Sequence, residues 1–374
     1  MLKHLVLFEL KYYRKQAVFW VAVAYSLFAG SLLLSNTSES LYYANSPFSV
    51  IDALLKFNAM STIFVTGFLA ASSILRDRTN NFESIIFSTP ILKFEYLSTK
   101  FIGLLSSTLF IHLVLTLTMM LSVYTIKPEL VGPFNIGDYL FGLTVILIPN
   151  ILLCVSIIFS TAMLTKKMMP IYIVTIALFV VYVAASMIGN SPLMAMSTPF
   201  TQEGGGIASL IDPYGIISFY EQSSFWSVED KNVMLPLLEG NFLYNRLSWL
   251  IISISILGLT YKRFSFKGKN STSKSKIITD DTVISLATYK PVSVENIFDK
   301  FNVKVFYSKL KIEYLSVVKG LSFFVIMCLI VVLNMITLGE NISRGPADQV
   351  SYYPLTELIL QLLQDPLSKI GILI

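Results

Sequence analysis

Long apolar segments recur along this chain, separated by polar or charged residues. A helix that crosses the roughly 30 Å hydrocarbon core of a bilayer needs about 20 mostly apolar residues, because each residue advances it by about 1.5 Å. Most of the segments reach this length, so the pattern predicts an all-α integral membrane protein. The predicted spans run from Ala17 to Leu34, Phe57 to Leu75, Phe101 to Val123, Tyr139 to Met163, Pro170 to Ile188, Ser248 to Tyr261 and Leu321 to Leu338.

The sixth segment is short for a membrane span. We expect its helix to begin upstream, near Leu243, and to include Arg246. An arginine can keep its charged end in the membrane interface while its stem stays in apolar surroundings. The prediction is therefore that Arg246 snorkels to the membrane surface.

The composition supports a membrane protein. Hydrophobic residues make up 54% of the chain and charged residues 14%, which leaves too few polar side chains to cover a soluble protein of 374 residues. A large soluble protein with several buried helices is the alternative, but such helices rarely stay apolar for so long.

Lysine and arginine are distributed unevenly between the two sides of the predicted topology. If the N-terminus is cytoplasmic, 22 of the 28 positive residues lie on the cytoplasmic side, as the positive-inside rule requires. The longest outside loop, 189–242, carries several acidic residues and only Lys231 as a positive one. Topology thus accounts for the net charge of +5, and no nucleic-acid partner is needed to explain it.

The N-terminal stretch predicts a basic amphipathic helix that lies along the cytoplasmic leaflet. Apolar and aromatic residues are interleaved there with four basic residues: Lys3, Lys11, Arg14 and Lys15. Such a helix binds membrane lipid by burying apolar side chains and by attraction to anionic headgroups. A cleavable signal peptide with a site near Ala29-Gly30-Ser31 is the alternative, which the many further spans disfavour.

The chain contains a weak internal repeat. The stretch 304–314 before the seventh segment resembles 7–15 before the first, and 351–358 resembles 44–51. Repeated halves are common in transporters. A further span begins near the C-terminus without being completed, so a fragment of a longer protein is one interpretation, and a seven-span protein with an interfacial C-terminal helix is the other. The expected parts are a first six-span half over 1–261, a basic cytoplasmic linker over 262–303 and the start of a second half over 304–374.

Motifs of catalysis are absent from the sequence. There is no G-x-x-x-x-G-K-[ST] loop for nucleotide phosphates and no G-x-S-x-G motif, and the two histidines, His4 and His112, cannot form an H-E-x-x-H zinc site. We therefore expect no catalytic residue, metal site or bound cofactor in this chain. His112 lies within the third span, where a hydrogen bond to a neighbouring helix is the simpler expectation and a functional group the alternative.

The segment between the second and third spans combines charge, an amphipathic stretch and a helix stop. A proline disfavours helical geometry at the residue before it, so we expect a helix over Asn80–Phe87 that ends before Pro90. Phe82, Ile85 and Ile86 share one face of such a helix and can dock in a groove of a cytoplasmic partner. An ordinary solvated loop is the alternative. The candidate docking residues are Arg76, Asp77, Arg78, Phe82, Glu83, Ile85, Ile86, Thr89 and Pro90.

Short motifs follow one another in a recognisable order. They are Phe8-Glu9-Leu10-Lys11-Tyr12-Tyr13 with Phe19-Trp20, Asn45-Ser46-Pro47-Phe48, Arg76-Asp77-Arg78 through Ser88-Thr89-Pro90-Ile91, Asp212-Pro213-Tyr214-Gly215, Phe225-Trp226-Ser227-Val228-Glu229-Asp230-Lys231-Asn232 and Asn245-Arg246-Leu247-Ser248-Trp249. In this order they resemble the type-2 permeases of ABC exporters. More narrowly, the chain resembles the N-terminal part of bacterial proteins in which such a permease is fused to a zinc aminopeptidase domain.

The resemblance implies a six-helix permease half plus the start of a second, repeated half. It implies a bacterial cytoplasmic (inner) membrane, and an ABC ATPase subunit as the partner that binds ATP. A second permease half or a homodimer would complete the pathway. Aminopeptidase activity is not carried over, because its zinc ligands have no counterpart in this sequence. Polar residues in the spans are candidate wall residues of the pathway, although such residues more often serve helix packing: Asn58, Thr62, Thr116, Thr118, Asn150 and Ser156.

Two other classes of function stay open. The chain can be a non-transporting membrane anchor or scaffold, or an intramembrane enzyme, which the absent motifs disfavour. Co-purification with an ATPase would separate the permease from the scaffold.

Overall fold

The structure is a computed structural model that describes residues 2–34, 42–80, 82–188, 202–266 and 303–318. These residues contain helices and no β-strand. One unit comprises Met1–Phe264 with Ile330–Ile374, and the other, Ser265–Leu329, contains helix α15 (Val303–Val318). The predicted seventh span and most of the predicted linker lie outside the described residues.

Five helices of the described chain are long and apolar enough to cross a membrane. Helices α1 (Leu2–Arg14) and α2 (Ala17–Leu33) meet at a bend of 69° and form a sixth crossing if they are counted together. The prediction of an all-helical fold with several helices apolar enough to cross a membrane is confirmed for the described residues. The five helices are Pro47–Thr79, Lys93–Thr125, Ile136–Thr165, Met168–Ser186 and Gly240–Arg263.

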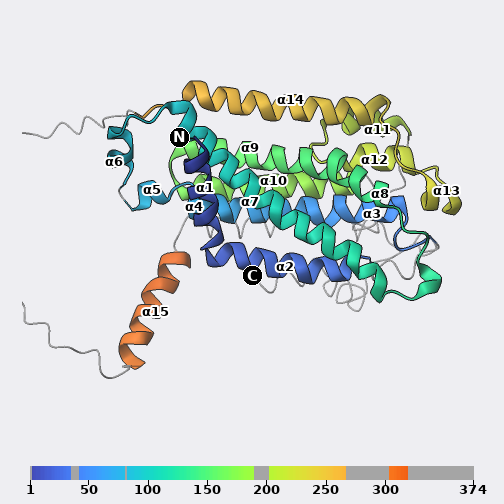
Figure 1. Ribbon diagram of the computed structural model, residues 1–374, viewed down its shortest axis with the longest axis horizontal. Helices are drawn as coiled ribbons and strands as arrows, with labels where there is room; N and C mark the ends of the chain where they lie inside the picture. The colour runs from blue at the N-terminus through green and yellow to red at the C-terminus, as the bar shows by residue number, and fades with distance from the viewer. Residues whose placement is uncertain (1, 35–41, 81, 189–201, 267–302, 319–374) are drawn as a thin grey trace, which may run out of the picture. The chain divides into compact units, whose positions relative to one another are not determined.

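The long helices of the first unit lie side by side, with short helices at both ends (Figure 1). We call the end that carries α1, α5 and α6 the basic end, and the end that carries α11, α12 and α13 the far end. The long helices are α2, α4 (Ala59–Ser73), α7 (Lys93–Ser122), α9 (Ile148–Thr165), α10 (Met168–Ile188) and α14 (Gly240–Arg263). The short ones are α3 (Pro47–Ala53), α5 (Arg76–Thr79), α6 (Glu83–Ser88), α8 (Ile136–Phe141), α11 (Gln202–Ile211), α12 (Ile216–Ser223) and α13 (Val228–Val233).

The second span begins at Pro47, upstream of the predicted Phe57. Ser46 caps this start, because its hydroxyl accepts a hydrogen bond from the Ser49 amide at 3.2 Å. Asp52 and Lys56 interrupt the apolar pattern here, yet they pair one helical turn apart and are largely buried. The pairing explains how two charged residues can lie within the second span. The hydropathy pattern alone excludes them and therefore places the start of this span too late.

Two of the spans contain a π-helical segment. These segments are η2 (Leu54–Asn58), between α3 and α4, and η5 (Gly142–Leu147), between α8 and α9. The Leu54 side chain lies over Gly142, where an added Cβ would collide with Leu54 Cδ1. Gly30 allows α2 to approach α7 closely, since a Cβ there would lie 2.7 Å from the carbonyl oxygen of Leu115 on α7.

The sixth span begins at Gly240, which confirms the upstream start expected from the sequence. The expected snorkelling of Arg246 is wrong: only 4% of this residue is exposed. Its guanidinium is directed into the bundle because two asparagine side chains accept hydrogen bonds from it there.

Candidate coupling site

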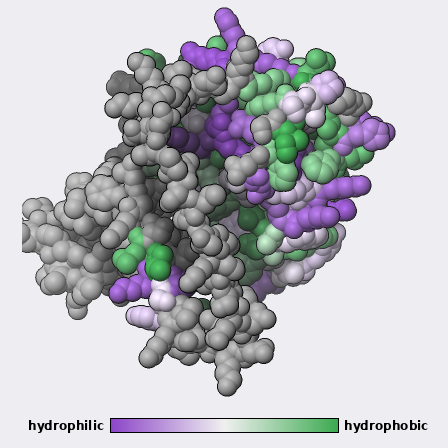
Figure 2. Space-filling view, turned by 90° about the vertical axis from the view of Figure 1, so that its left-hand side faces the viewer, coloured by the Kyte–Doolittle hydropathy of each residue, from purple (hydrophilic) through white to green (hydrophobic). Residues whose placement is uncertain are grey.

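Exposed cations gather at the basic end. They are Lys3, Lys11, Arg14, Lys15, Lys167, Lys262 and Arg263, whereas the far end has Lys127 and Lys231 among the described residues. Figure 2 looks onto the basic end, where hydrophilic and hydrophobic surface are intermixed in the part that is not grey. The uneven distribution of lysine and arginine along the sequence thus corresponds to an uneven distribution between the two ends of the helical bundle.

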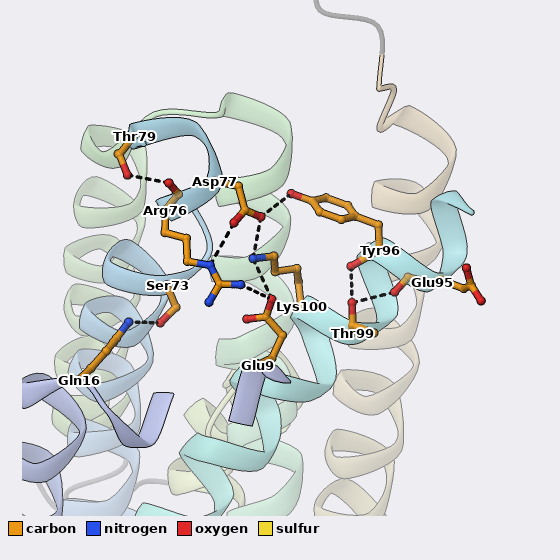
Figure 3. Close-up of polar contacts among 10 residues, drawn as sticks. All are labelled: Glu9, Gln16, Ser73, Arg76, Asp77, Thr79, Glu95, Tyr96, Thr99 and Lys100. Atoms are coloured by element: carbon orange, nitrogen blue, oxygen red, sulfur yellow. Dashed lines mark hydrogen bonds and ion pairs between the residues drawn. The ribbon is translucent and has the colours of Figure 1, made fainter. Parts of the chain in front are cut away.

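Four ionised side chains meet in the interior of the basic end (Figure 3). Arg76 Nη2 lies 2.6 Å from Glu9 Oε1, and Arg76 Nε lies 3.0 Å from Asp77 Oδ1. Lys100 Nζ lies 3.0 Å from the same Glu9 oxygen and 2.8 Å from Asp77 Oδ2. Their side chains are only 3% to 11% exposed. We call these four residues the ion cluster.

The ion cluster ties three helices together. Glu9 comes from α1, Arg76 and Asp77 from α5, and Lys100 from α7. The Tyr96 hydroxyl also donates to Asp77 Oδ2 at 3.3 Å. Two acids and two bases leave the cluster formally neutral, which is the condition under which buried charges are tolerated. Removing one partner of a buried pair typically costs about 3–5 kcal/mol, because it leaves another charge uncompensated.

Helix α1 packs on the bundle with a polar face. Glu9 and Tyr13 are buried, and a Cβ at Gly103 of α7 would lie 3.0 Å from Glu9 Cβ. Leu7 and Phe8 are 44% and 58% exposed, so neither is buried against the bundle. Lys3, Lys11, Arg14 and Lys15 are exposed as expected. Charge pairing with α5 and α7 decides which face of α1 turns inward, and helical periodicity alone does not predict it.

Helix α6 is fixed at its beginning by a second set of charges. Arg78 Nε lies 2.7 Å from Glu83 Oε2, and Lys166 Nζ lies 3.4 Å from Glu83 Oε1. Arg78 Nη1 also donates to the carbonyl oxygen of Lys166 at 3.1 Å. That carbonyl is accessible because Lys166 ends α9 in the left-handed conformation, with φ of 57°. The start of α6 is therefore held against the turn between α9 and α10.

The apolar face of α6 points outward. Phe82 and Ile85 are 54% and 59% exposed, and Ile86 is half-buried. The helix spans Glu83–Ser88, shorter than the expected Asn80–Phe87, with Phe82 at its N-cap position. Thr89 is extended with ψ of 154°, as expected before a proline, and both Thr89 and Pro90 are exposed. The helix thus presents two large apolar side chains at the basic end.

The predicted docking residues divide into two groups. Phe82, Ile85, Thr89 and Pro90 lie at the surface, whereas Arg76 and Asp77 belong to the ion cluster and Arg78 pairs with Glu83. The charges expected to orient a partner therefore hold the segment in place. The sequence analysis missed Glu9 and Lys100 as members of this site. Their signal was a single acid in a basic helix and a lysine at the edge of an apolar span.

A second polar cluster at the far end joins two motifs that are distant in the sequence. Asn245 Nδ2 donates to the carbonyl oxygens of Ser209 and Asp212 at 2.6 and 2.7 Å. Arg246 donates to Asn150 Oδ1 and Asn245 Oδ1, both at 3.0 Å. A side chain at Gly215, where φ is 78°, would collide with the guanidinium of Arg246. The cluster fastens α11 and α12 to α9 and α14.

Asp212 is fully enclosed in this far-end cluster. Burial raises the pKa of its carboxyl group. The amides of Ile217 and Tyr214, which donate to its two oxygens at 2.8 and 2.9 Å, and the positive charge of Arg246 oppose that rise.

The candidate wall residues do not line an open path in the described part of the chain. Asn58, Thr62, Thr116, Asn150 and Ser156 are buried, and Thr118 is half-buried with its hydroxyl bonded to its own helix. Asn150 takes part in the far-end cluster. These residues therefore contribute to helix packing in this conformation.

Two further observations bear on what the chain is. Within the described residues there is no group of three or more His, Cys, Asp or Glu side chains that could hold a metal ion. Comparison with known protein families and with curated proteins finds no match for this chain.

Proposed function

We propose that this chain is the membrane-spanning permease subunit of an ABC-type exporter and that a separate cytoplasmic ATPase docks on α6. The observation that carries the proposal is the exposure of Phe82 and Ile85 on a short helix at the basic end. Large apolar side chains at the centre of an interface supply most of its binding energy. The positive-inside rule makes the basic end cytoplasmic, where an ATPase has access.

The ion cluster gives the docked helix a mechanical connection to the bundle. Helix α6 follows α5 directly, and α5 shares charges with α1 and α7. A displacement of α6 on nucleotide binding would therefore move α1 and the start of α7 with it. The helix Pro47–Thr79 continues from α5 to the far end, where the Tyr220 hydroxyl of α12 donates to Asp52. This helix supplies a physical route from the ATPase to the opposite side of the membrane.

The transport pathway is proposed to form between this six-helix half and a second half or a second copy. In the helix Pro47–Thr79, 78% of the most apolar 18-residue stretch is buried inside the protein. In Gly240–Arg263 the corresponding share is only 22%. The weakly buried α14 leaves apolar surface for lipid or for further helices. We therefore propose that the residues lining the pathway lie on the exposed surface of α14, where a second half or a second copy would pack.

A binding measurement tests the docking proposal. Changing Phe82 and Ile85 together to Asp should weaken binding of the cognate ATPase by at least about 100-fold, because each good apolar anchor contributes about 2 kcal/mol. A matched control changes Phe225 and Val233, exposed at the far end, to Asp. The control should bind as wild type does. Equal ATPase recovery with all three proteins, in matched amounts in nanodiscs, would contradict the docking site and leave the anchor or scaffold function.

A further inference from the structure

A bridge of polar side chains crosses from α4 to α7 in the middle of the bundle. His112 Nε2 on α7 lies 2.9 Å from Thr62 Oγ1 and 3.1 Å from Ser61 Oγ on α4. His112 Nδ1 lies 2.8 Å from the carbonyl oxygen of Thr108. All of these residues are buried. The histidine therefore bonds a neighbouring helix, as the simpler expectation from the sequence had it.

Two contacts show the relative direction of α4 and α7. Asp77, which follows α4 in the same span, pairs with Lys100 at the basic end, and Thr62 meets His112 in the middle. Between these two contacts the residue number increases from 62 to 77 along one helix and decreases from 112 to 100 along the other, so the two helices are antiparallel. Positions four residues apart share a face of a helix.

Helical periodicity extends this row of polar residues in both directions. One turn from the Thr62 and His112 pair, we expect Thr66 to face Thr108. One turn in the other direction, we expect Asn58 to face Thr116. We call this row of residues the seam: Asn58, Thr62, Thr66, Thr108, His112 and Thr116.

Some polar groups of the seam lack partners. The side-chain nitrogen and oxygen of Asn58 and the hydroxyls of Thr66 and Thr108 have no hydrogen-bond partner in the described part of the chain. These three residues are at most 1% exposed. Thr62 and Thr116, in contrast, donate to carbonyl oxygens of their own helices at 2.6 and 2.9 Å. Buried polar groups are nearly always hydrogen-bonded, by protein or by ordered water.

Water is the ligand that suits these groups. A buried water makes about three hydrogen bonds to otherwise unsatisfied polar groups, and it needs both donors and acceptors around it. Asn58 offers both, and a threonine hydroxyl can act as either. The seam residues are buried, and their side chains carry no carboxylate that would favour a cation.

We propose that the seam is an internal water-binding site, in which water molecules bridge α4 and α7 by bonding Asn58, Thr66 and Thr108. The site begins where the π-helical segment η2 ends, at Asn58. Inserted water and π-helical turns both mark places where a helix bends or shifts. The water site stands on these contacts alone and does not depend on the docking of an ATPase.

The proposal can be tested by whether the Tm falls or rises when the hydroxyl groups of the seam are removed. Valine has the shape of threonine without the hydroxyl, so Thr66→Val with Thr108→Val removes the groups that would hold water. If water is bound, the full chain in nanodiscs loses hydrogen bonds and its Tm falls by several degrees. If the hydroxyls are unsolvated, removing them raises the Tm, which would overturn the proposal. Thr118→Val is the control, because that hydroxyl bonds Val114 within α7 at 2.8 Å, and it should leave the Tm nearly unchanged.

Hydroxyl-radical footprinting with X-ray pulses provides a second readout in the unaltered protein. Radicals formed from bound water oxidise the residues beside it, even when these are buried. Met119 lies on the same helix, is 0% exposed like His112, and packs in an apolar cluster with Leu33 and Leu54. Methionine is the more readily oxidised side chain. We expect His112 to be oxidised at least five-fold faster than Met119, and faster oxidation of Met119 would contradict the water site.

Discussion

The two ends of the helical bundle hold their buried charges in different ways. At the basic end, Glu9, Arg76, Asp77 and Lys100 neutralise one another across three helices. At the far end, Arg246 and Asp212 are satisfied mainly by amide side chains and backbone N–H groups.

This difference has a physical consequence. Each charge at the basic end has a partner on another helix, so the ion cluster holds α1, α5 and α7 together through charge pairing. In the far-end cluster Arg246 and Asp212 make hydrogen bonds to neutral groups, and these bonds fasten the short helices α11 and α12 to the bundle.

The largest expected effect comes from breaking charge balance at the basic end. Lys100→Met leaves Glu9 and Asp77 with Arg76 as the one positive charge in the ion cluster, and should lower the free energy of unfolding by about 3–5 kcal/mol. Changing Glu9 to Gln at the same time restores neutrality, so the double variant should lose less than the single one. Unfolding in mixed detergent measures both. Equal losses would mean that side-chain packing, and not charge, accounts for the effect.

A smaller and more local effect is expected at the far end. Arg246→Met removes the donor to Asn150 and Asn245 and the nearest positive charge to Asp212, which should cost about 1–3 kcal/mol for each buried polar group left unsatisfied. Proteolysis should then increase within 202–223 while the basic end stays protected. Arg246→Lys should be intermediate, since an ammonium cannot reproduce the geometry of a guanidinium. Uniform cleavage at both ends would argue that the two clusters are not separate.

The smallest expected effect is a pH dependence at the far end. Because the pKa of Asp212 is raised in the folded protein, the folded state binds more protons than the unfolded state once the pH exceeds the ordinary pKa of 3.8. Stability therefore decreases as the pH rises through that window. Asp212→Asn does not titrate, so the stability of wild type relative to this variant should fall from pH 4 upward. A constant difference between pH 4 and pH 7 would exclude the shift.

The sequence predicted the apolar helices well and the charged contacts poorly. Hydropathy located the five long apolar helices of the described residues, since a membrane helix must be apolar over most of its length. It missed the start of the second span, because Asp52 and Lys56 look unsuited to a membrane until they are seen as a pair. It located the exposed Phe82 and Ile85 of α6, but it assigned Arg76 and Asp77 to a partner. Their true partners, Glu9 and Lys100, become apparent only when α1 and α7 are placed in space.

The most direct test of the account uses the Glu9→Gln, Lys100→Met double variant together with the cognate ATPase. This variant keeps α6 and its exposed Phe82 and Ile85, but it removes the ion pairs of Glu9 and Lys100 and, among the contacts of the ion cluster, leaves only the Tyr96–Asp77 hydrogen bond between α5 and α7. We predict that the ATPase binds it within about three-fold of wild type, while the stimulation of ATP hydrolysis by the membrane subunit is lost. Stimulation equal to that of wild type, with equal binding, would contradict the claim that the ion cluster transmits movement from the docked helix to the bundle.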